Sequence, residues 1–145
     1  IEEIVEDSIK KAKEQDYREV TFVNKIEHNH QMVLADCFLL SHCLDIIFDN
    51  AIKFSPKHGK IELSSEIAGK YIRLKITDEG PGFSPKALDH IFELFKSDTH
   101  QNSYSGFGLG MATAKLIIDS MDGSIEIINT QTSGASVIVC LKLPN

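Results

Sequence analysis

The apolar and polar positions of residues 71–78 alternate one by one. Ile72, Leu74 and Ile76 share one side of this segment, and polar side chains fill the positions between them. Because successive side chains of a strand point to opposite faces, the alternation predicts a strand with one buried face. Asp78 lies on the apolar side, where an unpaired carboxylate costs several kcal/mol. The pattern therefore predicts that Asp78 accepts hydrogen bonds from a buried partner or ligand; the alternative is a strand end at which Asp begins a turn.

Two other segments have the apolar spacing of a helix. In residues 2–14, apolar side chains such as Val5 and Ala12 lie on one face and charged side chains on the other, which predicts an amphipathic helix packed on a core. A longer helix is predicted from Asp36, a favourable N-cap residue, to about Phe54. Its apolar stripe projects within about 60° of one direction. The stripe consists of Leu40, Cys43, Leu44, Ile47, Ala51 and Phe54.

One flank of this longer helix carries polar side chains beside the stripe. Asn50 lies about 80° from the stripe, and Ile46 and Lys53 lie further round on the same flank, whereas Asp49 points away to solvent. An amide oxygen is a suitable ligand for Mg²⁺, which proteins hold with few groups of their own together with phosphates, and a lysine one turn on can reach the same phosphates. Taken alone, Asn50 is also consistent with a satisfied helix amide, and Lys53 with a solvated surface charge.

Short elements account for the rest of the chain. Ser84, followed by proline, predicts the N-cap of a short helix that ends near residue 91. Residues 106–110 lead straight into another helix, with Leu109, Ala112 and Leu116 on one side. Strands are expected at residues 20–26, 32–35, 60–67, 71–78, 124–129 and 135–143. Since helices and antiparallel strand pairs alternate in blocks, we expect a two-layer α+β sandwich, with a mixed, mostly antiparallel sheet of about five strands and three main helices on one face.

Length, charge and cysteine usage exclude several classes of protein. With 145 residues the chain is expected to form a single domain over residues 1–145. A net charge of -6 and a pI near 5.5 argue against a nucleic-acid-binding surface. The three cysteines are odd in number and form no C-x-x-C pair, so we expect reduced, buried thiols in a cytosolic setting. His28 and His30 have no third ligand nearby, which favours a solvated loop over a metal site.

The sequence predicts no membrane segment in this chain. No signal peptide opens it, and no apolar run approaches the ~18 residues that span a bilayer. We therefore expect a cytoplasmic domain without direct membrane contact, whether or not the full-length protein is membrane-anchored. The first residue is not Met, which indicates a fragment of a longer protein.

Two glycine-rich segments are suited to ligand binding. Gly80 and Gly82 follow the predicted acceptor and leave open space where a flat ligand can approach the backbone. Residues 106–110 have the pattern G-x-G-x-G and lead into a helix, so that backbone N–H groups and the helix N-terminus favour a bound anion. Their spacing matches neither a P-loop nor a Rossmann motif. The polar residues 92–104 are typical of a mobile functional loop, with plain disorder as the alternative. Together these features indicate a purine triphosphate and a magnesium ion.

Four segments resemble the sequence boxes of sensor histidine kinases. Residues 48–56 (FDNAIKFSP), 78–83 (DEGPGF), 91–95 (IFELF) and 106–112 (GFGLGMA) are similar to the N box, first glycine box, F box and second glycine box. Their order and spacing match, and the resemblance covers nearly the whole chain as the catalytic, ATP-binding domain. It implies the Bergerat fold shared with gyrase, MutL and a heat-shock chaperone family.

The resemblance implies a role for each matching residue. Asp78 would accept from the exocyclic amine of adenine. Asn50 would hold Mg²⁺ and Lys53 would approach the phosphates, both at the catalytic centre. Phe92 and Phe95 would anchor a lid that closes over the nucleotide. The base pocket would be formed by Gly80, Gly82 and Phe83, and the triphosphate would be wrapped by Gly106, Phe107, Gly108, Leu109 and Gly110.

The sequence also departs from the pattern of this family. Ile46 stands one turn before Asn50, where the ATP hydrolysers carry Glu and many kinases carry Asn, Glu or His. An alkyl group is neither a base nor a metal ligand, so we expect inefficient ATP hydrolysis and weakened metal binding. None of the six histidines lies in an H-E-x-x-x-P-like context. The γ-phosphoryl group would therefore pass to a histidine on a separate dimerisation domain of the full-length protein, upstream of a response regulator.

Two alternatives remain open at this point. The first is a degenerate sensor that binds ATP without transferring phosphate. The second is another Bergerat-fold ATPase or an anti-sigma-type serine kinase. The absence of Glu at position 46 argues against the ATPase, and the four sequence boxes resemble those of sensor kinases more than those of either alternative.

Overall fold

The computed structural model describes residues 1–27, 31–93 and 110–145. The helices within them are α1 (Glu2–Glu14), α2 (Cys37–Phe54), α3 (Pro85–His90) and α4 (Gly110–Ser120). The strands are β1 (Thr21–Lys25), β2 (Lys60–Ala68), β3 (Tyr71–Thr77), β4 (Ser124–Asn129) and β5 (Ala135–Lys142). The bounds of α1, α2 and β4 agree closely with those predicted from the apolar pattern.

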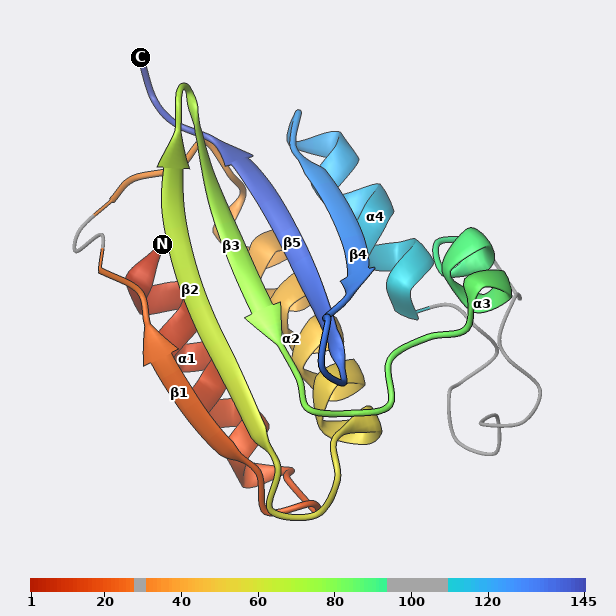
Figure 1. Cartoon of the computed structure of the whole chain (residues 1–145). Helices are drawn as coiled ribbons and strands as arrows, with labels where there is room; N and C mark the ends of the chain where they lie inside the picture. Colours follow the sequence, from red (N-terminus) through yellow and green to blue (C-terminus); the bar gives the residue numbers. More distant parts are fainter. Residues whose placement is uncertain (28–30, 94–109) are drawn as a thin grey trace.

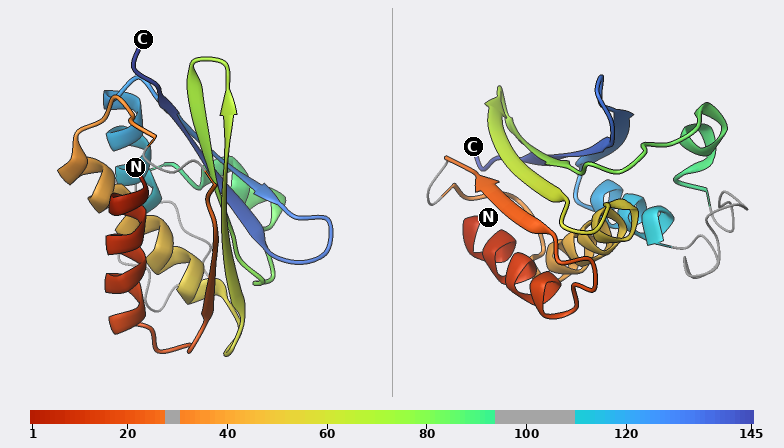
Figure 2. Two further views of the ribbon diagram at one scale, coloured as in Figure 1. Left: turned by 90° about the vertical axis from the view of Figure 1, so that its left-hand side faces the viewer. Right: turned by 60° about the horizontal axis from the view of Figure 1, so that its bottom comes forward.

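All five of these strands belong to one sheet, in the order β1-β2-β3-β5-β4. β1 pairs with β2 in parallel, and every other neighbouring pair is antiparallel. α1, α2 and α4 cover one face of the sheet, while α3 lies at the β4 side of the molecule (Figures 1 and 2). The expected α+β sandwich with a mixed sheet and helices on one face is confirmed.

The core lies between the helical layer and the inner face of the sheet. α2 contributes the predicted stripe except Phe54, which is only half-buried, and Phe48 and Ile52 widen the stripe. Phe48 is fully buried and meets Phe22 of β1 edge to face, with ring centroids 5.7 Å apart. Burying one such side chain contributes about 1.5–3 kcal/mol, so α2 is held mainly by its apolar face. The helix begins where predicted, because the Asp36 carboxylate accepts a hydrogen bond from the backbone N–H of Leu39 at 2.9 Å.

The alternation of β3 is also confirmed. Ile72, Leu74 and Ile76 are each at most 2% exposed, and they point into the core. Asp78, the first residue after the strand on the same side, is only 7% exposed. The chain thus carries a carboxylate to the end of a buried row, as its spacing predicts.

Three predictions about individual segments were wrong. Residues 32–35 do not form a strand. The Leu34 N–H donates to the Lys142 carbonyl at 2.8 Å, but no further backbone hydrogen bonds among the described residues extend this pairing into a ladder. Leu116 is 64% exposed and does not join the buried side of α4, which Ala112 shares with Met111, Ala114, Ile117 and Ile118. Cys37 is exposed in the first turn of α2, outside the apolar stripe, so the thiols are not all buried. His28 and His30 lie outside the described residues.

Candidate nucleotide-binding site

The buried carboxylate of Asp78 has one oxygen engaged and one free. Its Oδ1 accepts the backbone N–H of Gly80 at 2.8 Å and, more weakly, that of Ala135 at 3.4 Å. Oδ2 makes no hydrogen bond to any described residue. Burial raises the pKa of Asp78, and the two backbone hydrogen bonds oppose that rise. The arrangement is that of an acceptor held in a fixed orientation, with its second oxygen available to a ligand that donates hydrogen bonds.

The turn after Asp78 requires glycine because it passes against the end of α2. A Cβ at Gly80 would stand 2.3 Å from the Phe54 carbonyl oxygen and 2.9 Å from Asp78 Oδ1. Gly82 has a φ of +76°, in the left-handed region that favours glycine. The Phe83 ring, which follows, meets the Phe54 ring edge to face at 5.3 Å. The first glycine box and the end of α2 are therefore packed together, as expected of one binding site.

The turn between β4 and β5 supports this loop, and the sequence reasoning missed it. Asn129 accepts from the Phe83 N–H and donates from Nδ2 to the Phe83 carbonyl, each at 2.8 Å. Gly134 has a φ of +102°, and a Cβ there would stand 2.0 Å from the Asp78 carbonyl oxygen. The glycine in this turn was visible in the sequence, but nothing in the sequence relates Asn129 to a loop 46 residues away.

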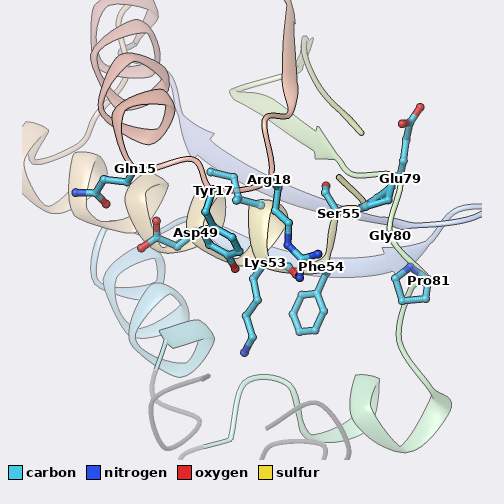
Figure 3. A pocket seen from close by; sticks show the side chains of 12 residues that line it. Gln15, Tyr17, Arg18, Asp49, Lys53, Phe54, Ser55, Glu79, Gly80 and Pro81 are labelled. Atoms are coloured by element: carbon cyan, nitrogen blue, oxygen red, sulfur yellow. The ribbon is translucent and has the colours of Figure 1, made fainter. Parts of the chain in front are cut away.

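A cavity of about 990 Å³ opens beside the C-terminal end of α2 (Figure 3). It is lined by Gln15, Tyr17, Arg18, Asp49, Ile52, Lys53, Phe54, Ser55, Pro56, Glu79, Gly80 and Pro81. Lys53 and Gly80 are the predicted site residues among them, whereas Asn50 and Asp78 lie outside this lining. Arg18 donates to the Lys53 carbonyl at 3.4 Å, which joins the loop before β1 to this end of α2.

Lys53 projects from the end of α2 beside Phe54, and its positive charge faces the cavity (Figure 3). Its ammonium lies 5.2 Å from the centroid of the Phe54 ring. Partial burial lowers the pKa of Lys53 from its ordinary value. A bound anion would oppose that effect, because a nearby negative charge favours the charged form of lysine.

The described residues do not form a metal site by themselves. Among them, no three His, Cys, Asp or Glu side chains come together to hold a metal ion. Asn50 is half-buried on α2, but the residue one turn earlier is Ile46, whose Cγ2 would lie 3.5 Å from a Cβ added at Gly110. Mg²⁺ is usually held by one or two carboxylates together with substrate phosphates, and this flank of α2 supplies a single amide.

The lid is only partly within the described residues. Phe92 is half-buried and packs against the core, and the Lys115 ammonium of α4 lies 5.9 Å from its ring centroid. The Ser84 hydroxyl caps α3 as predicted, accepting from the Ala87 N–H at 3.1 Å. Gly110 opens α4. The other residues predicted for the lid and the phosphates lie outside the described part of the chain: Phe95, Gly106, Phe107, Gly108 and Leu109.

Residues 35–145 match the family model of the histidine kinase-, DNA gyrase B- and HSP90-like ATPases. The chain belongs to this ATPase family. Curated relatives of the chain include bacterial sensor proteins. Sensor protein CiaH of Streptococcus pneumoniae is 30% identical over 130 residues, which cover 86% of this chain and 28% of CiaH. Sensor protein CreC of Escherichia coli is 36% identical over 111 residues, which cover 77% of this chain and 23% of CreC. The chain thus spans less than a third of the length of these relatives.

Solved histidine kinase domains have the same fold as this ATPase domain. The mycobacterial sensor histidine kinase MprB is 25% identical, with a TM-score of 0.84 over 97% of this chain and 93% of that one. The catalytic domain of histidine kinase ThkA is 23% identical and matches with a TM-score of 0.87 over 99% of this chain and 92% of that one, which shows the likeness of the fold. The predicted resemblance to sensor histidine kinases and the Bergerat fold are confirmed. Within the described residues, no helix has the length and apolarity needed to cross a bilayer.

Proposed function

We propose that this ATPase-family chain binds ATP and donates its γ-phosphoryl group to a histidine on a separate dimerisation domain, in two-component signal transduction. The observation that carries the proposal is Asp78, a carboxylate 7% exposed with one oxygen held by backbone N–H groups and the other without a partner in the described part of the chain. A buried acceptor of this kind is costly unless a ligand donates to it. The exocyclic amine of adenine is such a donor.

The other site residues follow from this placement of the base. Gly80 and Gly82, with Phe83, would shape the pocket around adenine, and Lys53 would neutralise phosphate charge. Asn50 would offer its amide oxygen to Mg²⁺ carried by the nucleotide, whose chemistry is to offset charge on the phosphate oxygens. The F box and second glycine box, which include Phe92, Phe95 and residues 106–110, would close over the triphosphate.

In the transfer itself, an imidazole nitrogen of the partner histidine attacks the γ-phosphorus. The bond from phosphorus to the β–γ bridging oxygen breaks, and ADP leaves. Within the described residues, this chain would contribute positioning and charge neutralisation, mainly through Asp78 and Lys53. A response regulator would then accept the phosphoryl group from the histidine.

We place all of residues 1–145 in this one catalytic domain. α1, which precedes the matched region, supports this: Val5 is fully buried in the common core, and the Lys11 ammonium pairs with the Asp45 carboxylate of α2. We propose a cytoplasmic location, where ATP and response regulators are present. The -6 charge of the chain gives no support for a nucleic-acid partner.

The experiment supplies the chain with a histidine-bearing dimerisation hairpin, fused or in trans, and γ-labelled ATP. We expect acid-labile, alkali-stable label on the hairpin, and no label on a hairpin whose acceptor histidine is replaced by Gln. Calorimetry with ATP, run in parallel, reports binding separately. Absence of binding would refute the whole proposal.

Ile46 favours one alternative, a nucleotide sensor that binds ATP without transferring phosphate. Its side chain has no group that can act as a base or hold a metal beside Asn50. In the same assay, ATP binding without label on the hairpin would support this alternative. Steady release of inorganic phosphate, or label on serine, would instead support a Bergerat-fold ATPase or an anti-sigma-type serine kinase.

A further inference from the structure

The flank of α2 that faces α4 has only one oxygen ligand to offer. It carries Cys43, Ile46, Asn50 and Lys53 at helical spacing. The Cys43 thiol donates to the Ala114 carbonyl at 3.8 Å, and burial raises its pKa to about 12, so that no thiolate forms near neutral pH. The amide oxygen of Asn50 is therefore the single metal ligand among these four side chains.

The carboxylates of α2 are committed elsewhere. The Asp45 carboxylate pairs with the Lys11 ammonium of α1. Asp49 lines the cavity near Gln15 (Figure 3), and the charged groups that act on it are Asp45 and the Lys11 ammonium of α1. Neither carboxylate joins Asn50, and across the described ranges no cluster of three ionisable ligands exists. The usual protein contribution to Mg²⁺, one or two carboxylates, is absent from this helix face.

Ile46 occupies the position from which a second ligand would act. Residues four apart on a helix share a face, so the side chain at 46 is the natural neighbour of Asn50. Its Cγ2 lies beside the first residue of α4 and would be in ordinary contact, at 3.5 Å, with a Cβ added at Gly110. Lys53, on the same flank, supplies an ammonium group instead of an oxygen ligand.

We infer that ATP binds this chain with little help from Mg²⁺, because Ile46 packs against α4 in place of an oxygen ligand and Lys53 offsets the phosphate charge. This inference rests on the proposed ATP binding. Thermodynamic linkage gives this inference a measurable form. The ratio of the ATP Kd without Mg²⁺ to the ATP Kd with Mg²⁺ equals the factor by which binding to the protein increases the affinity of ATP for Mg²⁺. We expect a ratio within about threefold of one, equivalent to less than about 0.7 kcal/mol.

The test is calorimetric titration of the 145-residue chain with ATP, in Mg²⁺ or in EDTA at matched ionic strength. Ile46→Asn adds an oxygen ligand on a smaller side chain, and we expect it to raise the ratio at least about tenfold, or about 1.4 kcal/mol. Ile46→Leu is the matched control: it keeps the alkyl group, and its ratio should equal that of the wild type. Melting temperatures show which variants are folded.

Two outcomes would overturn the inference. A wild-type ratio of about tenfold or more would mean that the protein holds the cation, and this measurement needs no variant. A folded Ile46→Asn chain with the ratio of Ile46→Leu would mean that position 46 does not face the cation. Failure to bind ATP in either buffer would refute the proposed function itself, so the two failures are distinguishable.

Discussion

Replacing Asp78 by Asn tests the buried acceptor while preserving its shape. The amide oxygen of the variant can still accept the Gly80 N–H, which now reaches Asp78 Oδ1 at 2.8 Å. The free Oδ2 becomes an NH₂ group, which is a donor facing the amine of adenine. The substitution therefore removes one acceptor and one buried charge and leaves the turn intact.

The expected loss of affinity follows from the value of one hydrogen bond to a charged group. Such a bond contributes about 1.5–3 kcal/mol. Since about 1.4 kcal/mol is tenfold in Kd, ATP and ADP should bind roughly 10- to 150-fold more weakly to Asp78→Asn. Calorimetry measures this directly. Asp7→Asn is the matched control, because it makes the same Asp-to-Asn change at an exposed position of α1 outside the cavity and should leave the Kd unchanged.

The same variant should become more stable relative to the wild type as the pH rises. Burial raises the pKa of Asp78 in the folded chain, so proton binding favours folding. That contribution is fully present below the unfolded pKa and is lost as the pH rises through the folded pKa. The Asn side chain never ionises, so the variant should be the more stable chain at neutral pH, and the difference should shrink in acid.

Either half of the prediction can fail by itself. An unchanged Kd for Asp78→Asn would show that adenine does not donate to this carboxylate. A variant that unfolds at lower urea concentration than the wild type at pH 7, with the gap closing in acid, would contradict the argument from burial.

Three further predictions concern the supports of the site. Asn129→Ala removes both hydrogen bonds to the Phe83 main chain and should lower the free energy of unfolding by about 1–3 kcal/mol in urea titrations; an unchanged midpoint would show that the pair contributes nothing. Gly134→Ala brings a methyl group against a carbonyl oxygen at positive φ and should cost about 1–3 kcal/mol or more by the same measure. Iodoacetamide at pH 8 should label the exposed Cys37 and spare Cys43, because a pKa of about 12 keeps the Cys43 thiol protonated. Mass spectrometry of the two cysteine peptides measures their alkylation rates, and equal rates would contradict this prediction.

The prediction of residues 32–35 as a strand shows where local pattern is insufficient. A short apolar run has strand propensity, but a strand forms only where a partner offers a continuing ladder. Here Leu34 reaches the β5 end through a single hydrogen bond to Lys142, and the chain turns into α2 instead. The sequence of residues 32–35 does not show whether a neighbouring strand is available to pair with them.

The sequence by itself determined the elements and the chemistry at their ends. It did not show that the space beside Gly80 and Gly82, which we expected to stay open for a flat ligand, is filled by the Phe54 carbonyl and the Asn129 side chain. The alternation of β3 predicted the buried Asp78, and Asp36 predicted the start of α2. These features depend on neighbours within a few residues, so periodicity and capping preferences reveal them.

Only the tertiary structure decided which distant residues support the site. The order β3-β5-β4 brings Asn129 and Gly134 to the loop that holds Phe83, and the packing of α2 on α4 places Ile46 against Gly110. Such contacts join positions far apart in the chain, and no local preference encodes them, because they arise when the whole apolar core is buried between sheet and helices.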